Sequence, residues 1–282
     1  MLMKTSGKVF LWIVSIIIAV GIGFAIPGFA QQQKKQSQTT IPTFYLHGYS
    51  GTANSTNGMI SYATKNSNAH KVFTATVDKN GKVTLKGDWS KDVSRPIVQV
   101  VFQDNRNNNF KVTQSWFKNV LTAVNKKHSF KQFNAVAHSM GNLTLMYYEL
   151  YNGPDKKLPQ LQKQINIAGH FDGILGRDDK ANENTIQANG EPKILNSYYK
   201  DQLNRRNNFP KDQVDILNIY GNLNDGSNSD GDVTNVSSQS LRYLLRGRFK
   251  SYEEFRVFGP KAQHSQLHEN EQVDKQISNF LW

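Results

Sequence analysis

The stretch that decides the fold is Ala137-His138-Ser139-Met140-Gly141. It follows an apolar run, residues 133–136, and precedes a segment with helical spacing, residues 142–151. A serine with a tiny residue two positions away on each side, between a strand and a helix, is typical of a nucleophile elbow. Such a turn lifts the serine hydroxyl above the sheet edge and points the free N–H groups of the helix at the reacting atom. Alanine stands where the first glycine is usual, and it is the next smallest side chain.

Outward from this turn, strand-like and helix-like segments alternate along the chain. Strands that alternate with helices favour an α/β fold, with a mostly parallel sheet and helices on both faces. The turn residues 78–81 between two alternating runs indicate one hairpin. Apolar patterning predicts strands at residues 42–46, 72–77, 82–86, 96–102, 133–136, 164–169, 214–221 and 255–259, and helices at residues 117–124, 142–151, 237–245 and 273–281.

Residues 171–212 interrupt the alternation. They are rich in Asn, Asp, Lys and Gln and carry few apolar anchors. They follow a predicted strand and precede the next one, which places them above the carboxyl edge of the sheet. A polar cap-like excursion over a site is therefore expected here.

A serine nucleophile needs a base, and the base needs an acid that orients it. In a fold of this kind the chain order is serine, acid, histidine, and both later partners follow predicted strands. Asp230 is the predicted acid because an aliphatic anchor, Val233, follows shortly after it. Asp232 and Asp225 are the alternatives.

His264 is the predicted base, and His268 is the alternative. His138 is adjacent to the serine in sequence and should point away from it, in a supporting role. His170 ends a strand near the site. His47 is expected to brace its loop.

Backbone N–H groups must stabilise the negative charge that develops in the reaction. The predicted donors are the N–H groups of Met140, at the helix start, and of Tyr49, in the loop after the first strand. Gly48 permits a close approach of that loop.

The N-terminal segment is uncharged from residue 9 to residue 33, and Lys4 and Lys8 precede it. Residues 1–30 are predicted to be a signal peptide or a membrane anchor, and either one exports the rest of the chain. Residues 31–40 are predicted to be a linker, and residues 41–282 are predicted to be the catalytic domain. The expected location is the extracellular side of the cell membrane, anchored or secreted.

The chain carries 34 Lys and Arg against 22 Asp and Glu, a net charge of +12. This balance suits an anionic cell-wall surface, and the membrane is a partner through the N-terminal segment if that segment is retained. The basic residues are scattered and form no nucleic-acid module, so no nucleic acid is predicted as a partner. No cysteine occurs. Neither a cofactor nor a metal is predicted, although a loose calcium site in the loop 225–232 stays open; an EF-hand is excluded there by Gly226 and Ser237.

Together these motifs resemble the α/β-hydrolase superfamily. Within it, the chain resembles the exported α/β-hydrolase family of Gram-positive bacteria long described as a domain of unknown function. The segments that carry the resemblance are residues 47–51, 137–141, 229–231 and 264–268, and it covers residues 41–282. The elbow is also similar to that of small secreted bacterial lipases. The resemblance implies a serine hydrolase fold and triad, but no substrate.

The leading hypothesis for the function is an exported carboxylesterase that acts on a small-molecule ester through Ser139, His264 and Asp230. A lipase on long acyl chains is the first alternative, and the polar excursion argues against it. The second alternative is a non-catalytic cell-surface binding protein on the same fold. Short or polar acyl esters are the expected substrates, because a polar cap offers little apolar surface to a long chain.

Overall fold

A computed structural model describes residues 40–282 of the protein. The predicted signal peptide or anchor, residues 1–30, lies outside the described residues, as does the predicted linker apart from Thr40. Within residues 40–282, no helix combines the length and the apolar character needed to cross a membrane.

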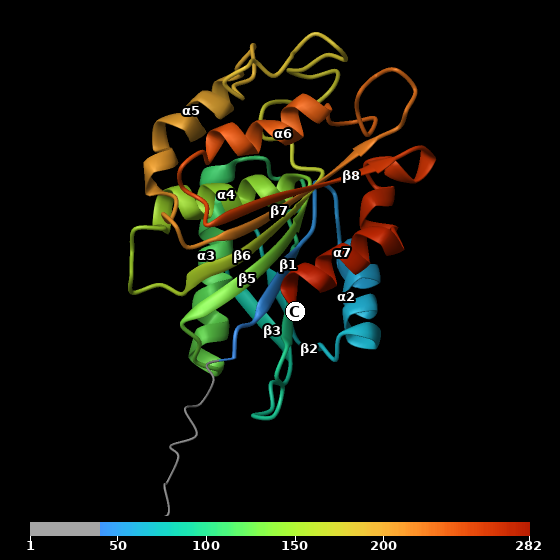
Figure 1. Cartoon of the computed structure of the whole chain (residues 1–282). Coiled ribbons are helices and arrows are strands. Elements are labelled where there is room, and N and C mark those ends of the chain that lie inside the picture. Colours follow the sequence, from blue (N-terminus) through green and yellow to red (C-terminus); the bar gives the residue numbers. More distant parts are fainter. Residues whose placement is uncertain (1–39) are drawn as a thin grey trace, which may run out of the picture. The chain divides into compact units, whose positions relative to one another are not determined.

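An eight-stranded sheet forms the centre of the domain, in the order β3-β2-β4-β1-β5-β6-β7-β8 (Figure 1). All neighbouring strands run parallel except β2 and β3, which form the predicted hairpin. The mostly parallel α/β fold is therefore confirmed. The strands are β1 (Thr43–Leu46), β2 (His70–Val77), β3 (Val83–Gly87), β4 (Pro96–Phe102), β5 (Gln132–His138), β6 (Gln160–Ile167), β7 (Asp215–Asn222) and β8 (Ser251–Phe258).

Helices cover both faces of the sheet, and each face has its own apolar core (Figure 1). On one face, Phe117 and Leu121 of α3 pack with Leu143 of α4. On the other face, Met59 of α2 and Ile277 of α7 belong to the second core. The helices are α2 (Asn54–Asn66), α3 (Phe110–Lys127), α4 (Met140–Asn152), α5 (Ser197–Arg205), α6 (Asn235–Leu244) and α7 (Glu271–Leu281), with the short 3-10 helices η1 (Arg206–Asn208), η2 (Pro260–Ala262) and η3 (Gln266–Glu269).

Two helices, α2 and α5, have no counterpart in the sequence prediction. Both are polar along most of their length. Helix α2 buries only Thr56, Met59, Ile60 and Ala63, and α5 buries only Tyr199 and Gln202. A narrow buried stripe of this kind gives little periodic signal in the sequence, because most helical positions face solvent.

The parallel strands bring three loops to one edge of the sheet. Strands β5, β7 and β8 run in the same direction, and their carboxyl ends lead into Ser139, into the loop 223–234 and into the loop 259–270. The connection after β6 adds the excursion 171–212, which holds α5 and η1. Polar segments far apart in the sequence therefore meet at this edge.

Candidate active site

Ser139 occupies a sharp turn between β5 and α4. Its φ of +49° and ψ of −121° lie in a region that residues other than glycine seldom adopt. The Ser139 N–H donates to the carbonyl of Ile167 at 2.9 Å, which ties the turn to the end of β6. A strained conformation of this type at the mouth of a pocket is typical of a functional residue.

The small residues around the turn are required by close backbone contacts. A Cβ added to Gly141 would lie 2.8 Å from the carbonyl oxygen of His47, and one added to Gly48 would lie 2.9 Å from Cβ of Ser139. Both distances are too short for real side chains. The elbow and the loop after β1 are therefore in direct contact, and glycine is needed on both sides.

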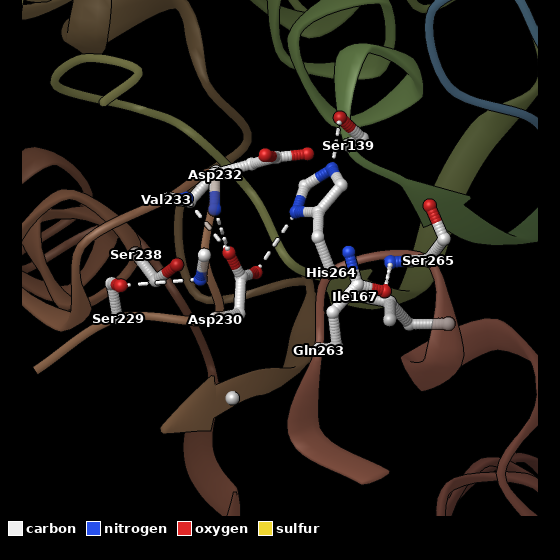
Figure 2. Close-up of polar contacts among 12 residues, drawn as sticks. Ser139, Ile167, Ser229, Asp230, Asp232, Val233, Ser238, Gln263, His264 and Ser265 are labelled. Carbon is white, nitrogen blue, oxygen red and sulfur yellow. Dashed lines mark hydrogen bonds and ion pairs between the residues drawn. The ribbon is translucent and has the colours of Figure 1, made fainter. Parts of the chain in front are cut away.

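The structure brings together the three residues predicted to act as nucleophile, base and acid (Figure 2). Nε2 of His264 lies 2.9 Å from Oγ of Ser139, and Nδ1 of His264 lies 2.9 Å from Oδ2 of Asp230. The side chains reach one another from three different loops, and all three residues are buried. The alternative base, His268, hydrogen-bonds to Glu269 instead.

Asp230 is fixed on both sides of its carboxylate. While Oδ2 faces His264, Oδ1 accepts hydrogen bonds from the N–H groups of Asp232 at 3.0 Å and Val233 at 2.7 Å. The residue is 1% exposed. The aliphatic anchor expected after the acid is thus also a backbone donor to it. Asp232 is exposed, and Figure 2 shows its side chain on the same side of Asp230 as the ring of His264.

Two opposing effects set the charge of His264. Burial lowers its pKa, but the hydrogen bond to Asp230 and the charges of Asp230 and Asp232 raise it, and the net pKa lies above the usual value of histidine. A histidine with this environment can take up a proton from the serine hydroxyl, because a carboxylate stabilises the imidazolium that forms.

Two further histidines brace the site. His138 is 5% exposed, and its Nε2 lies 3.1 Å from the carbonyl oxygen of His264, so it links the elbow to the base loop. His47 accepts the N–H of Phe102 at Nε2, at 3.0 Å, and its Nδ1 lies 2.8 Å from the carbonyl oxygen of Gly48. Because a carbonyl only accepts, Nδ1 of His47 carries the proton. His47 braces its loop.

The predicted oxyanion donors lie beside the serine. Met140 is the first residue of α4, and both Met140 and Tyr49 line the pocket that contains Ser139. The close contact between Gly48 and Ser139 places the backbone of the loop 47–51 against the nucleophile position. The two N–H groups as an oxyanion hole stay a prediction.

Ser139, His138 and His264 line a pocket of about 520 Å³. Its wall mixes apolar and polar side chains. The other lining residues are Gly48, Tyr49, Ser50, Gly51, Ser55, Asn108, Phe110, Met140, His170, Ile174, Arg177, Asp232, Val233, Ser265 and His268.

Only the first part of the excursion 171–212 contributes to this pocket, through Ile174 and Arg177. Phe110 and Asn108, from the start of α3 and the residues before it, supply wall that the sequence analysis did not assign. No local motif marks these residues. They reach the site because α3 starts at the carboxyl end of β4, at the same edge as the elbow.

The carboxylates of the acidic loop 225–232 do not converge on one point. Asp225 accepts the N–H and the hydroxyl of Ser227, and Asp230 faces His264. Across residues 40–282, no group of three or more His, Cys, Asp or Glu residues is placed to hold a metal ion.

The fold and the pocket define an α/β hydrolase. Residues 30–282 match a family described as "Alpha/beta hydrolase of unknown function (DUF915)", and the chain belongs to this family. The family resemblance expected from the sequence is therefore confirmed.

Two solved structures share the architecture over most of their length. A Listeria innocua protein is 27% identical, with a TM-score of 0.78 over 86% of this chain and 94% of its own. A Lactobacillus plantarum protein, provisionally described as a cell surface hydrolase, is 21% identical, with a TM-score of 0.68 over 86% of this chain and 90% of its own. No curated protein sequence matches the chain.

Proposed function

We propose that this α/β hydrolase is an exported serine esterase that cleaves small carboxylic esters. The observation that carries the proposal is the chain of two hydrogen-bond contacts from Oγ of Ser139 through His264 to Asp230, both at 2.9 Å, which we call the relay. It opens into a pocket of about 520 Å³, within the range of small-molecule sites. A non-catalytic binding protein would have no need to keep all three side chains in register.

In the proposed reaction, Oγ of Ser139 attacks the ester carbonyl while Nε2 of His264 takes the hydroxyl proton. Asp230 stabilises the imidazolium, and the N–H groups of Met140 and Tyr49 hold the negative oxygen of the tetrahedral intermediate. His264 then returns the proton to the leaving alcohol, which leaves an acyl group on Ser139. Water, deprotonated by His264, releases the acid and restores the enzyme.

The decisive experiment compares Ser139→Ala with wild type, by ester hydrolysis and by labelling with an active-site phosphonate. Ser139→Ala is expected to lose labelling and at least about 10³-fold in turnover, since triad residues act as a unit. Ser265→Ala is the matched control, because Ser265 also lines the pocket, but within residues 40–282 its hydroxyl has no hydrogen bond to a histidine. Labelling that persists in Ser139→Ala, or is lost only in Ser265→Ala, contradicts the proposal.

The lipase alternative is tested by a chain-length series of p-nitrophenyl esters below their micelle concentrations, beside an emulsified triglyceride. Each buried methylene contributes about 0.8 kcal/mol only if apolar surface receives it. The wall of this pocket includes the apolar side chains of Phe110 and Ile174 but also the polar side chains of Asn108 and Arg177. Specificity constants are therefore expected to level off after a few carbons. A steady rise through long chains, with a jump at the lipid interface, favours the lipase.

Export is part of the proposal and depends on residues 1–30, which lie outside the described residues. The flanking Lys4 and Lys8 favour a cytoplasmic N-terminus and an external catalytic domain. Protease shaving of intact cells is expected to remove an anchored domain, and culture medium to contain a cleaved one. Full-length protein in the soluble cytoplasmic fraction contradicts both.

A further inference from the structure

His170 is a pocket residue that the proposed reaction does not use. It is 4% exposed and lines the pocket of Ser139, and its Nδ1 is buried without a hydrogen-bond partner. Burial lowers the pKa of His170 to about 3, with smaller contributions from the charge of His264 and then that of Arg177, so the ring is neutral. A buried polar atom without a partner costs free energy, so the ring of His170 has an unused hydrogen-bonding group.

Arg177 lies close to His170 and is the only Lys or Arg among the described residues that line this pocket. Its side chain is exposed, and within residues 40–282 its guanidinium makes no hydrogen bond and no ion pair. Guanidinium groups bind carboxylates and phosphates through paired, charge-assisted hydrogen bonds. The pocket wall therefore holds a guanidinium without a hydrogen bond or ion pair and an imidazole whose Nδ1 has no hydrogen-bond partner within residues 40–282.

A short turn holds Arg177 in place. The N–H of Arg177 donates to the carbonyl of Ile174 at 3.1 Å, and the N–H of Leu175 donates to the carbonyl of Asp232 at 2.8 Å. Asp178 and Asp179 do not line the pocket, and both carboxylates accept bonds from the surrounding loops. The turn is thus anchored to the acid loop, and its neighbouring acids are occupied by backbone N–H groups and by the hydroxyl of Thr234.

Among the described residues that line this pocket, Asp232 is the only Asp or Glu. Besides the buried Asp230 of the relay, Asp232 is the acid nearest the site, and its charge raises the pKa of His264. Arg177 instead affects His170. Both Arg177 and Asp232 line the pocket.

We propose that His170 and Arg177 form an anion subsite beside Ser139, so that the preferred ester carries a phosphate or carboxylate group close to the scissile bond. This rests on the proposed esterase function. The guanidinium pairs with the anionic oxygens, and the neutral imidazole of His170 hydrogen-bonds to the same group or to an adjacent hydroxyl. Phe110 and Ile174 enclose the short apolar part between the anion and the ester.

The test uses two pairs of esters, each of which compares an anionic ester with a neutral counterpart. The acetyl ester of glycerol 3-phosphate is compared with monoacetylglycerol, and methyl hydrogen glutarate with methyl pentanoate. In at least one pair, kcat/KM of wild type is expected to favour the anion, and Arg177→Gln to lower that preference by roughly 10- to 100-fold. His170→Asn should lower it less. The first pair reports an anion on the alcohol side, and the second an anion on the acyl side.

Arg246→Gln is the matched control, because it removes an equal charge from an exposed residue outside the pocket. It is expected to leave the preference unchanged. Equal use of charged and neutral esters by wild type, or a preference that survives in Arg177→Gln, overturns the subsite while the esterase function stands. Thermal unfolding shows whether each variant is folded.

Calorimetric binding of glycerol 3-phosphate, with glycerol as the neutral control, decides the subsite if none of these esters is hydrolysed. Selective binding by wild type that is lost in Arg177→Gln supports the subsite without any turnover. Absence of binding to wild type, or equal binding to both proteins, overturns it. The esterase function is judged separately, by labelling of Ser139.

Discussion

Two segments can be compared: residues 132–152, which contain the elbow between β5 and α4, and the excursion, residues 171–212. Both reach the carboxyl edge of the sheet, but they are stabilised in different ways. From Phe133 to Leu150 every residue of this segment is buried, whereas half of the excursion is exposed. Steric exclusion fixes the elbow, as the close contacts at Gly48 and Gly141 show. The excursion is held by polar bonds from a few side chains and by three buried rings, those of Phe171, Tyr199 and Phe209.

Asn184 and Asp172 are the clearest of these anchors. Asn184 donates to the carbonyl of Ile194 at 2.8 Å and accepts the N–H groups of Thr185 and Ile194, both at 2.9 Å. Asp172 accepts the N–H of Asn196 at 2.9 Å. The difference teaches that a tightly packed turn leaves a sequence signature, while a polar loop depends on partners that are distant in sequence.

The largest expected effect comes from removing the base that contacts the elbow serine. His264→Ala should lower kcat/KM by about 10³-fold or more, because the serine loses its base. His268→Ala should change it by less than about tenfold, since His268 contacts Glu269 and not the serine. Steady-state kinetics of the two variants side by side decide this, and a reversed order reassigns the base.

The acid gives the next largest effect. Asp230→Asn should lower kcat by about 10³- to 10⁴-fold, because the amide no longer holds the correct tautomer of His264. Asp232→Asn should cost less than about tenfold, since Asp232 has no hydrogen bond to the base. Without Asp230 the pKa of His264 should fall, so the acidic limb of the pH–rate profile should shift to lower pH. An equal loss in both variants would contradict a single orienting acid.

The excursion should respond in stability more than in activity. Asn184→Ala leaves buried backbone groups without partners and is expected to cost about 1–3 kcal/mol of unfolding free energy. Turnover of a neutral ester should change by less than about twofold. Asn204→Ala is the control, because Asn204 is an exposed position of α5. Denaturant unfolding measures both, and equal stability of the two variants would show that Asn184 anchors nothing.

The smallest effect is a dependence of stability on pH. Burial raises the pKa of Asp172 to about 7 and that of Glu149, in α4, to about 8. The folded state therefore binds more protons than the unfolded chain above pH 4–5, so stability falls as pH rises through 7–8. The melting temperature should be lower at pH 8.5 than at pH 6.

Glu149→Gln should reduce this fall, because its Oε1 has no partner and the amide stays neutral. Glu253→Gln, at an exposed position, should not. A melting temperature that rises from pH 6 to pH 8.5 in wild type would refute the protonated state of both carboxyls.

Much of the fold could be predicted from the sequence because apolar periodicity is local. Strand β4 has the predicted bounds, Pro96–Phe102, and the hairpin β2–β3 follows from the turn at 78–81. Helices α2 and α5 could not be predicted, since each buries only a few side chains against distant elements. The pocket wall at Phe110 and Asn108 was missed for the same reason.

The sequence by itself determined the elbow, the chain order serine–acid–histidine and the loops in which these three residues lie. Small residues and strand ends can be recognised from a few neighbouring positions in the sequence. Only the tertiary structure decided that Asp230 and His264, rather than Asp232 and His268, lie within hydrogen-bond distance of one another. It also decided that His170 and Arg177 face the same pocket. The physical reason is that strand order and loop packing set distances between residues that no local pattern relates, and hydrogen bonds form or fail over tenths of an ångström.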